Sequence, residues 1–180
     1  MADPSPDVRW TAVRDAATGH GSVATLSRAL IHEGDARVRE AIFTALVKLA
    51  SSESIDVLLQ SLRSDESHLR TGAMDALRTA PAVIAVQLPL LLADADSDVR
   101  LLACDLAREL DGAVVQGLLC ALIDSDPQPN VCAAAIEVLT EIGDGEALPS
   151  LARCADRFPD DPFLLFAIAA ASERLSAPRG

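Results

Sequence analysis

The chain has 180 residues and a formal charge of −12, because 27 acidic side chains outnumber 15 basic ones. This charge argues against nucleic acid or an anionic membrane surface as a partner, since both attract basic proteins. Half of the residues are hydrophobic, which excludes disorder for most of the chain, and no apolar run reaches the roughly 18 residues of a transmembrane helix. The first residues, MADPSPDVRW, have neither the basic nor the apolar region of a signal peptide, and the four cysteines are widely spaced, so we expect a cytoplasmic protein with reduced thiols.

The predicted elements begin with a helix over residues 5–18, and its apolar pattern then recurs along the chain. An apolar residue opens each of six segments at steps of 30 to 32 residues, and a small residue follows four positions later in five of them. Further apolar residues follow at seven or eight positions. Spacings of four, seven and eight describe one face of an α-helix. The opening residues are Val8, Val38, Leu69, Val99, Val131 and Phe163.

Between these helices lie second apolar segments at helical spacing, each followed by an acidic turn whose Asp or Ser is expected to cap the next helix. One such hairpin cannot bury its apolar face alone, so neighbouring hairpins must stack. The sequence therefore predicts an all-α protein, an α-solenoid of stacked antiparallel helix hairpins that forms one domain over residues 1–180. Its five hairpins are predicted at residues 20–50, 51–80, 81–111, 112–142 and 143–176.

The segments VRWTAVRDA and DSDVRLLACDLA resemble the second helix of short HEAT-like repeats. The stretch GDGEALPSL, at residues 143–151, resembles the junction that opens the next repeat in the subclass named after phycobilisome lyases. The resemblance covers essentially the whole chain. It implies that the second helices line the concave face of a superhelix. It leaves the function open, because such repeats serve scaffolds, adaptors, lyases and a few enzymes.

An arginine directly follows the opening residue in the first four segments, and acidic residues recur in the preceding turns. We interpret these arginines as a structural ladder that binds carboxylates or carbonyls of the turns, with an anion-binding stripe as the alternative. The predicted ladder stops where Cys132 and Leu164 replace arginine. Its arginines are Arg9, Arg39, Arg70 and Arg100, and the nearby acids are Asp7, Asp35, Asp65, Asp96 and Asp98.

The second helices are also expected to carry a partner-binding groove, in which an apolar seam runs beside an acidic row. Such a groove suits a protein or peptide with apolar anchors and Lys or Arg side chains. The alternative is that the residues five positions after each opening residue, among them Phe43 and Met74, pack against neighbouring repeats. The predicted seam is Trp10, Phe43, Met74 and Leu101, and the predicted row is Asp75, Asp105 and Glu137.

Motifs that would indicate chemistry do not occur in the sequence. It has no Gly-rich phosphate loop, and His20, His32 and His68 show no ligand spacing with one another or with the cysteines. We therefore predict no catalytic residue, no metal and no cofactor. The leading hypothesis is a non-catalytic scaffold or adaptor for a protein or peptide. The alternative is a bilin (tetrapyrrole) lyase or chaperone-type subunit that acts with a partner.

The last predicted helix opens with FLLFAIAAA, nine residues without a charged or hydrogen-bonding side chain. If Phe163 starts the inward stripe, three large apolar side chains lie on faces that an end cap would expose to water. A patch of this kind marks an association surface, so we expect a two-fold homodimer through this helix. A following segment or a different partner that covers the patch is the alternative. The three side chains are Leu164, Leu165 and Ile168.

Overall fold

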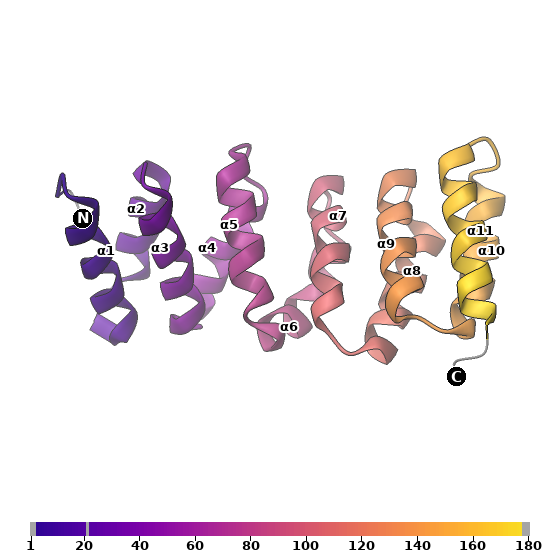
Figure 1. Cartoon of the computed structure of the whole chain (residues 1–180), viewed down its shortest axis with the longest axis horizontal. Coiled ribbons are helices and arrows are strands. Elements are labelled where there is room, and N and C mark those ends of the chain that lie inside the picture. The colour runs from indigo at the N-terminus through magenta and orange to yellow at the C-terminus, as the bar shows by residue number, and fades with distance from the viewer. Residues whose placement is uncertain (1–2, 21, 178–180) are drawn as a thin grey trace. The chain divides into compact units, whose positions relative to one another are not determined.

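The computed structural model describes residues 3–20 and 22–177, apart from the side chains of residues 19 and 20. The predicted His20 side chain therefore lies outside this description. The described residues form helices joined by short turns, with no strand among them, which confirms the all-α prediction (Figure 1). The chain divides into two compact units, residues 1–83 (unit 1) and 84–180 (unit 2), which we describe separately. The single domain over residues 1–180 stays a prediction.

Unit 1 contains a leading helix and two helix hairpins, as the repeat pattern predicts. The helices α1, α3 and α5 pack side by side in one layer, and α2 packs on α4 in the other (Figure 1). We use the term second helices for the second helix of every hairpin together with the leading helix α1. The bounds are α1 (Pro6–Asp15), followed by the π-helical turn η1 (Ala16–His20), α2 (Val23–His32), α3 (Ala36–Leu49), α4 (Ser52–Leu62) and α5 (Ser67–Arg78).

Unit 2 repeats this arrangement. The second helices α7, α9 and α11 pack in one layer, and the first helices α8 and α10 contact each other in the other (Figure 1). The helix α6 (Pro81–Leu92) begins in unit 1 and continues into unit 2. The remaining bounds are α7 (Ser97–Leu106), η2 (Ala107–Glu109), α8 (Gly112–Ser125), α9 (Pro129–Ile142), η3 (Gly145–Ala147), α10 (Leu148–Arg157) and α11 (Pro162–Ser176).

The acidic turns start several second helices by capping them. The carboxylate of Asp35 accepts hydrogen bonds from the backbone N–H groups of Arg37 and Val38, and Asp96 and Asp161 cap α7 and α11 in a similar way. These carboxylates satisfy N–H groups that have no partner inside the helix. Three positions after the N-cap of every second helix stands an apolar residue, which is buried in α3, α7, α9 and α11, half-buried in α5 and exposed in α1. The N-caps are Ser5, Asp35, Glu66, Asp96, Gln128 and Asp161.

Counted from its N-cap, α11 opens its buried face at Leu164 and not at Phe163. Leu164 and Ile168 are buried, Leu165 is half-buried, and Phe163 and Phe166 are 88% and 76% exposed. The prediction that Leu164 and Ile168 lie on exposed faces is therefore wrong. A shift of one residue turns a helix by about 100°. Because every residue of FLLFAIAAA is apolar, its composition does not indicate which side of the helix is buried.

The recurring arginines hold the turn that precedes their own helix. Each one donates from Nη1 to the backbone carbonyl oxygen of the residue six positions earlier, at 2.6 to 2.9 Å. Cys132 occupies the same position in α9, and its Sγ lies 3.6 Å from the carbonyl oxygen of Asp126. At this turn Arg157 of α10 also donates to the carbonyl oxygens of Ile123 and Asp126. The arginine pairs are Arg9 with Asp3, Arg39 with Glu33, Arg70 with Ser64 and Arg100 with Asp94.

Two of these arginines also bind a carboxylate in the turn of the following hairpin. Arg9 donates to both carboxylate oxygens of Glu33 at 2.9 and 2.8 Å, which lowers the pKa of Glu33. Arg100 donates to both oxygens of Asp126 at 2.6 and 3.0 Å, and both side chains are buried. The acids that the sequence suggests as partners of these arginines do not pair with them. Asp35 and Asp96 are caps, Asp7 pairs with Arg37, and Asp65 and Asp98 are exposed.

The cysteines are free thiols in the core, in agreement with their wide spacing. Cys104, Cys132 and Cys154 are buried, and Cys120 is half-buried. Burial raises the pKa of the Cys104 thiol to about 12, so this side chain is a neutral apolar group at physiological pH. Within residues 3–20 and 22–177, none of the helices has the length and apolar character that crossing a membrane requires.

Candidate partner-binding surface

The row of residues five positions after each opening residue is packed between helices, which corrects the predicted seam. Phe43 is 3% exposed and Met74 is 4% exposed. A Cβ atom added at Gly72 of α5 would lie 2.6 Å from Cδ2 of Phe43 and closer still to Cε2, so the Phe43 ring is pressed against α5. The physical reason is the helix period. A side chain at the fifth position after the opening residue points about 80° away from the solvent-facing side of its helix. It therefore points towards the second helix of the next repeat.

The outward face of the second helices is made by other positions of the repeat. This face consists of the residue that precedes each opening residue and of the residues two, six, and nine or ten positions after it. Three hollows lie along the face. Trp10 and Leu101, the other two residues of the predicted seam, both belong to the two-position row and both are half-buried. Trp10 lines a hollow in unit 1, whereas Leu101 lies on α7 in unit 2.

Unit 1 carries a hollow of about 420 Å³ between α1 and α3, which we call the Trp10 hollow. The guanidinium of Arg14 lies over the Trp10 ring, 4.7 Å from its centroid. Arg37 pairs with Asp7 at 2.6 Å on the exposed edge. The charged residues that line the hollow are three cations, Arg14, Arg37 and Lys48, and one carboxylate, Glu40.

A second hollow of unit 1, of about 430 Å³, lies between α3 and α5. Phe43 and Thr44 line it from α3, and His68, Thr71 and Asp75 line it from α5. Asp75, the first member of the predicted acidic row, pairs with Arg78 at 2.9 Å. The acidic row is therefore compensated by a cation in unit 1.

Unit 2 places the other two members of the acidic row around one arginine. Arg108 lies 3.3 Å from Asp105 and 3.2 Å from Glu137, and it also pairs with Glu141. The hydrogen bond to Glu141 and the surrounding negative charge raise the pKa of Arg108. Sequence reasoning missed Arg108, although it lies nine positions after Val99 and so on the outward face. Glu137 and Glu141 share this one arginine and are 69% and 53% exposed.

Beside this cluster lies a hollow of about 550 Å³ between α9 and α11, which we call the α9–α11 hollow. Its floor is made of alanines, and Glu137, Thr140 and Glu141 lie along its α9 side. Phe163 and Phe166 precede Ala170 by seven and four residues, so they extend the apolar face of α11 that borders the hollow. The floor alanines are Ala133 and Ala134 of α9 and Ala167 and Ala170 of α11.

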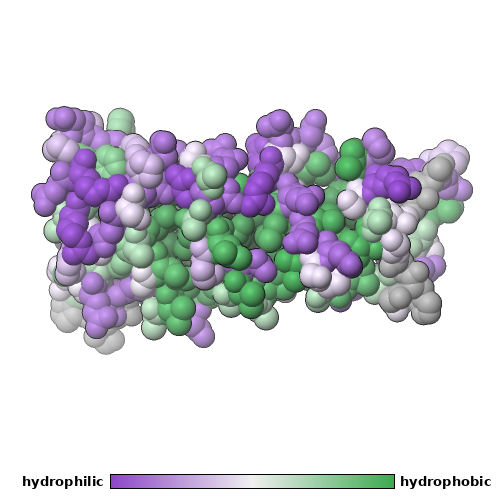
Figure 2. All heavy atoms as spheres, turned by 180° about the vertical axis from the view of Figure 1, so that it is seen from behind, coloured by the Kyte–Doolittle hydropathy of each residue, from purple (hydrophilic) through white to green (hydrophobic). Residues whose placement is uncertain are grey.

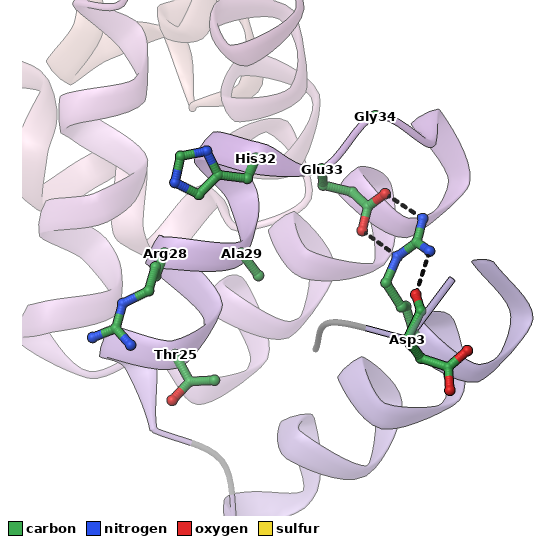
Figure 3. Close-up of a pocket in the computed structure, with 8 residues that line it drawn as sticks. Asp3, Thr25, Arg28, Ala29, His32, Glu33 and Gly34 are labelled. Carbon is green, nitrogen blue, oxygen red and sulfur yellow. Dashed lines mark hydrogen bonds and ion pairs between the residues drawn. The ribbon is translucent and has the colours of Figure 1, made fainter. Parts of the chain in front are cut away.

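Two further surfaces lie away from the second helices. Seen from behind, apolar side chains gather over the first helices, where Val86 and Leu90 of α6 and Val114 of α8 are exposed (Figure 2). A hollow of about 580 Å³ lies beside the Arg9–Glu33 pair. Arg28 and His32 of α2 line it and extend to the same side (Figure 3). Their spacing of four residues is a signal that sequence reasoning did not use.

Among the described residues, no group of three or more His, Cys, Asp and Glu side chains could hold a metal ion.

The repeats of this chain match those of a known protein family. A family model described as HEAT repeats matches residues 1–78 and 84–172, which is most of the chain. The chain is a HEAT-repeat protein. This match and the helix arrangement within each unit confirm the predicted α-solenoid class.

Two solved structures resemble this HEAT-repeat protein, and both are crystal structures of engineered proteins. The first is 18% identical, covers 98% of this chain and 96% of its own, and has a TM-score of 0.44. The second is 19% identical, covers 97% of this chain and 92% of its own, and has a TM-score of 0.43. No curated protein matched the chain.

Proposed function

We propose that this HEAT-repeat protein is a non-catalytic scaffold or adaptor that binds a protein or peptide through the second-helix face of unit 2. The observation that supports this proposal is the α9–α11 hollow. Its alanine floor includes Ala170 of α11, and the exposed Phe163 and Phe166 lie two turns and one turn before Ala170. Glu137 and Glu141 of the Arg108 cluster line the α9 side. Helical repeats generally serve protein interaction through such extended faces.

The chemistry of this surface indicates what the partner segment carries. Burying a large apolar side chain contributes about 1.5–3 kcal/mol, so two exposed phenylalanines offer substantial binding energy to apolar anchors. Glu137 and Glu141, which share the single Arg108 guanidinium, attract Lys or Arg side chains and select their position. We therefore infer a partner segment with apolar side chains for the phenylalanines and basic side chains for Glu137 and Glu141.

Capture from a lysate of the native host with matched variants tests this proposal. Phe166→Glu places a charge beside the hollow, and Val114→Glu makes the same change at an equally exposed residue on α8 of the same unit. We expect the proteins captured by the parent to be retained by Val114→Glu and lost by Phe166→Glu. Equal capture by both variants would contradict a binding site at the α9–α11 hollow.

A second copy of the chain is the other partner that could cover Phe163 and Phe166. Two exposed aromatic side chains on one helix can pair with the same helix of another molecule around a two-fold axis. Sedimentation of the parent beside Phe163→Glu/Phe166→Glu at tens of micromolar separates the two occupants. A dimer that the double variant abolishes assigns the surface to self-association, whereas a monomeric parent leaves the surface to a different partner.

A further inference from the structure

We propose that the Trp10 hollow of unit 1 is a second recognition site, and that it binds an acidic peptide segment with an apolar side chain between its carboxylates. This preference is opposite in charge to the one inferred for unit 2. The two sites use different helices and different residues. The proposal therefore does not depend on the function proposed for the α9–α11 hollow.

Charge is the first observation behind this proposal. Unit 1 as a whole has 9 basic and 11 acidic side chains, yet the lining of the Trp10 hollow has three cations and one carboxylate. Among the described residues, no carboxylate pairs with Arg14 or Lys48, and Arg37 pairs only with the exposed Asp7. Anionic side chains entering the hollow would therefore meet two cations that are not neutralised by the protein itself.

The second observation is the Trp10 ring, which forms an apolar wall of the same hollow. The ring is half-buried, and Arg14 is held over its face. This contact positions the guanidinium at the border between the ring and the solvent. Ala17, Ala41 and Ala45 complete the apolar part of the lining. An aliphatic or aromatic side chain can pack there while its neighbouring carboxylates reach the cations.

The spacing of the cations limits the length of the segment. Arg37 and Lys48 both belong to α3 and lie eleven residues apart, which corresponds to about 16 Å along the helix. An extended peptide of about five residues covers that distance. Glu40 and Thr44 lie between them on the same face. The segment that fits therefore has acidic residues at both ends and an apolar residue at its centre.

Fluorescence gives a direct test, because Trp10 is the only Trp in a chain without Tyr. The probe is the peptide acetyl-Asp-Glu-Leu-Glu-Asp-amide, which does not itself fluoresce, titrated at constant ionic strength. We expect a saturable change of Trp10 emission. Lys48→Glu is expected to raise the dissociation constant at least tenfold. Arg28→Glu makes the same charge change on α2, outside the Trp10 hollow, and is expected to leave the constant within about twofold.

Three results would overturn the proposal. The first is the absence of a saturable change at millimolar peptide with the parent protein. The second is an equal response to the peptide with Gln and Asn in place of its acids, which would reduce the site to an apolar contact. The third is the same response to inorganic phosphate alone, which would identify a small-anion site. Phe166→Glu serves as a further control, because it disables the site proposed in unit 2 and is expected to leave this titration unchanged.

Discussion

At the scale of single residues, the structure contains two arginine–aspartate pairs that differ mainly in burial. Arg100 grips Asp126 with two hydrogen bonds, and the carboxylate of Asp126 is 1% exposed. Arg153 grips Asp124 with two hydrogen bonds of similar length, but that pair lies at the surface. The two aspartates, Asp124 and Asp126, are two residues apart in the sequence. They therefore allow the effect of burial to be measured within one molecule.

We predict that Asp126→Ala destabilises the protein by about 3–5 kcal/mol, because it leaves the Arg100 guanidinium buried without its counter-charge. Asp124→Ala is expected to cost no more than about 1 kcal/mol, since water solvates Arg153 once its partner is gone. Urea unfolding followed by circular dichroism measures both values. Similar losses for the two variants would mean that burial does not decide the importance of these pairs.

The Arg9–Glu33 pair predicts a pH dependence. The hydrogen bond from Arg9 lowers the pKa of Glu33 in the folded protein below its ordinary value of 4.5. Its contribution to stability is therefore complete above the unfolded pKa and is lost as the pH falls through the folded pKa. We expect Glu33→Gln to be less stable than the parent by on the order of 1 kcal/mol near pH 7.

That difference should shrink steadily below pH 4.5 and vanish once Glu33 is protonated in both states. Thermal unfolding of parent and variant side by side between pH 7 and pH 3 measures it, and the comparison cancels the titration of the other acids. A stability difference that stays constant over this range would show that the charge of Glu33 does not contribute.

At the scale of elements, the sequence predicted the helices and their order well, because each second helix carries its own apolar period. It failed on the rotation of α11. Asp161 caps this helix, and its carboxylate accepts a hydrogen bond from the N–H of Leu164. Counting three residues from each N-cap would have placed Leu164 inward, as it places Val38 and Val99. The hollows were harder to predict, because they depend on side chains from two helices that no single-helix pattern relates.

The contact between α3 and α5 supplies a prediction at this scale. Gly72 leaves no room for a side chain, because a Cβ atom there would meet the Phe43 ring. Gly72→Val is therefore expected to destabilise unit 1 by about 1–3 kcal/mol through overpacking. Adding Phe43→Ala should recover part of this loss by making space, although Phe43→Ala alone is destabilising. A double-mutant cycle in urea measures the coupling, and purely additive effects would contradict the contact.

At the scale of the whole molecule, charge is distributed very unevenly. Unit 1 has 9 basic and 11 acidic side chains, whereas unit 2 has 6 basic and 16 acidic ones, a net charge of −10. Repulsion among these acids opposes compaction, and added salt weakens it because the screening length falls from about 10 Å at 0.1 M to about 3 Å at 1 M. Added NaCl is therefore expected to raise the melting temperature, by roughly 2–4 °C for each kcal/mol of repulsion that is screened.

Calorimetry in low and high NaCl measures this effect, with a matched pair of variants. Asp156→Lys lowers the negative charge of unit 2 and should weaken the salt dependence. Asp56→Lys makes the same change at an exposed residue of unit 1, where the charges are nearly balanced, and should weaken it less. A melting temperature that falls with salt would mean that ion pairs such as those of Arg108 outweigh the repulsion.

The turn at residues 126–128 has a consequence for synthesis of the chain on the ribosome. Arg9, Arg39, Arg70 and Arg100 each bind a carbonyl six residues earlier, so these turns can close with residues that have already emerged. The turn before α9 binds Arg100 and Cys132, but it also accepts hydrogen bonds from Arg157, which lies 31 residues after Asp126. Because domains fold from the N-terminus during translation, this turn gains its contacts with Arg157 only after α10 has left the exit tunnel. During synthesis the α8–α9 hairpin therefore reaches its full set of turn contacts later, relative to its own emergence, than the hairpins before it.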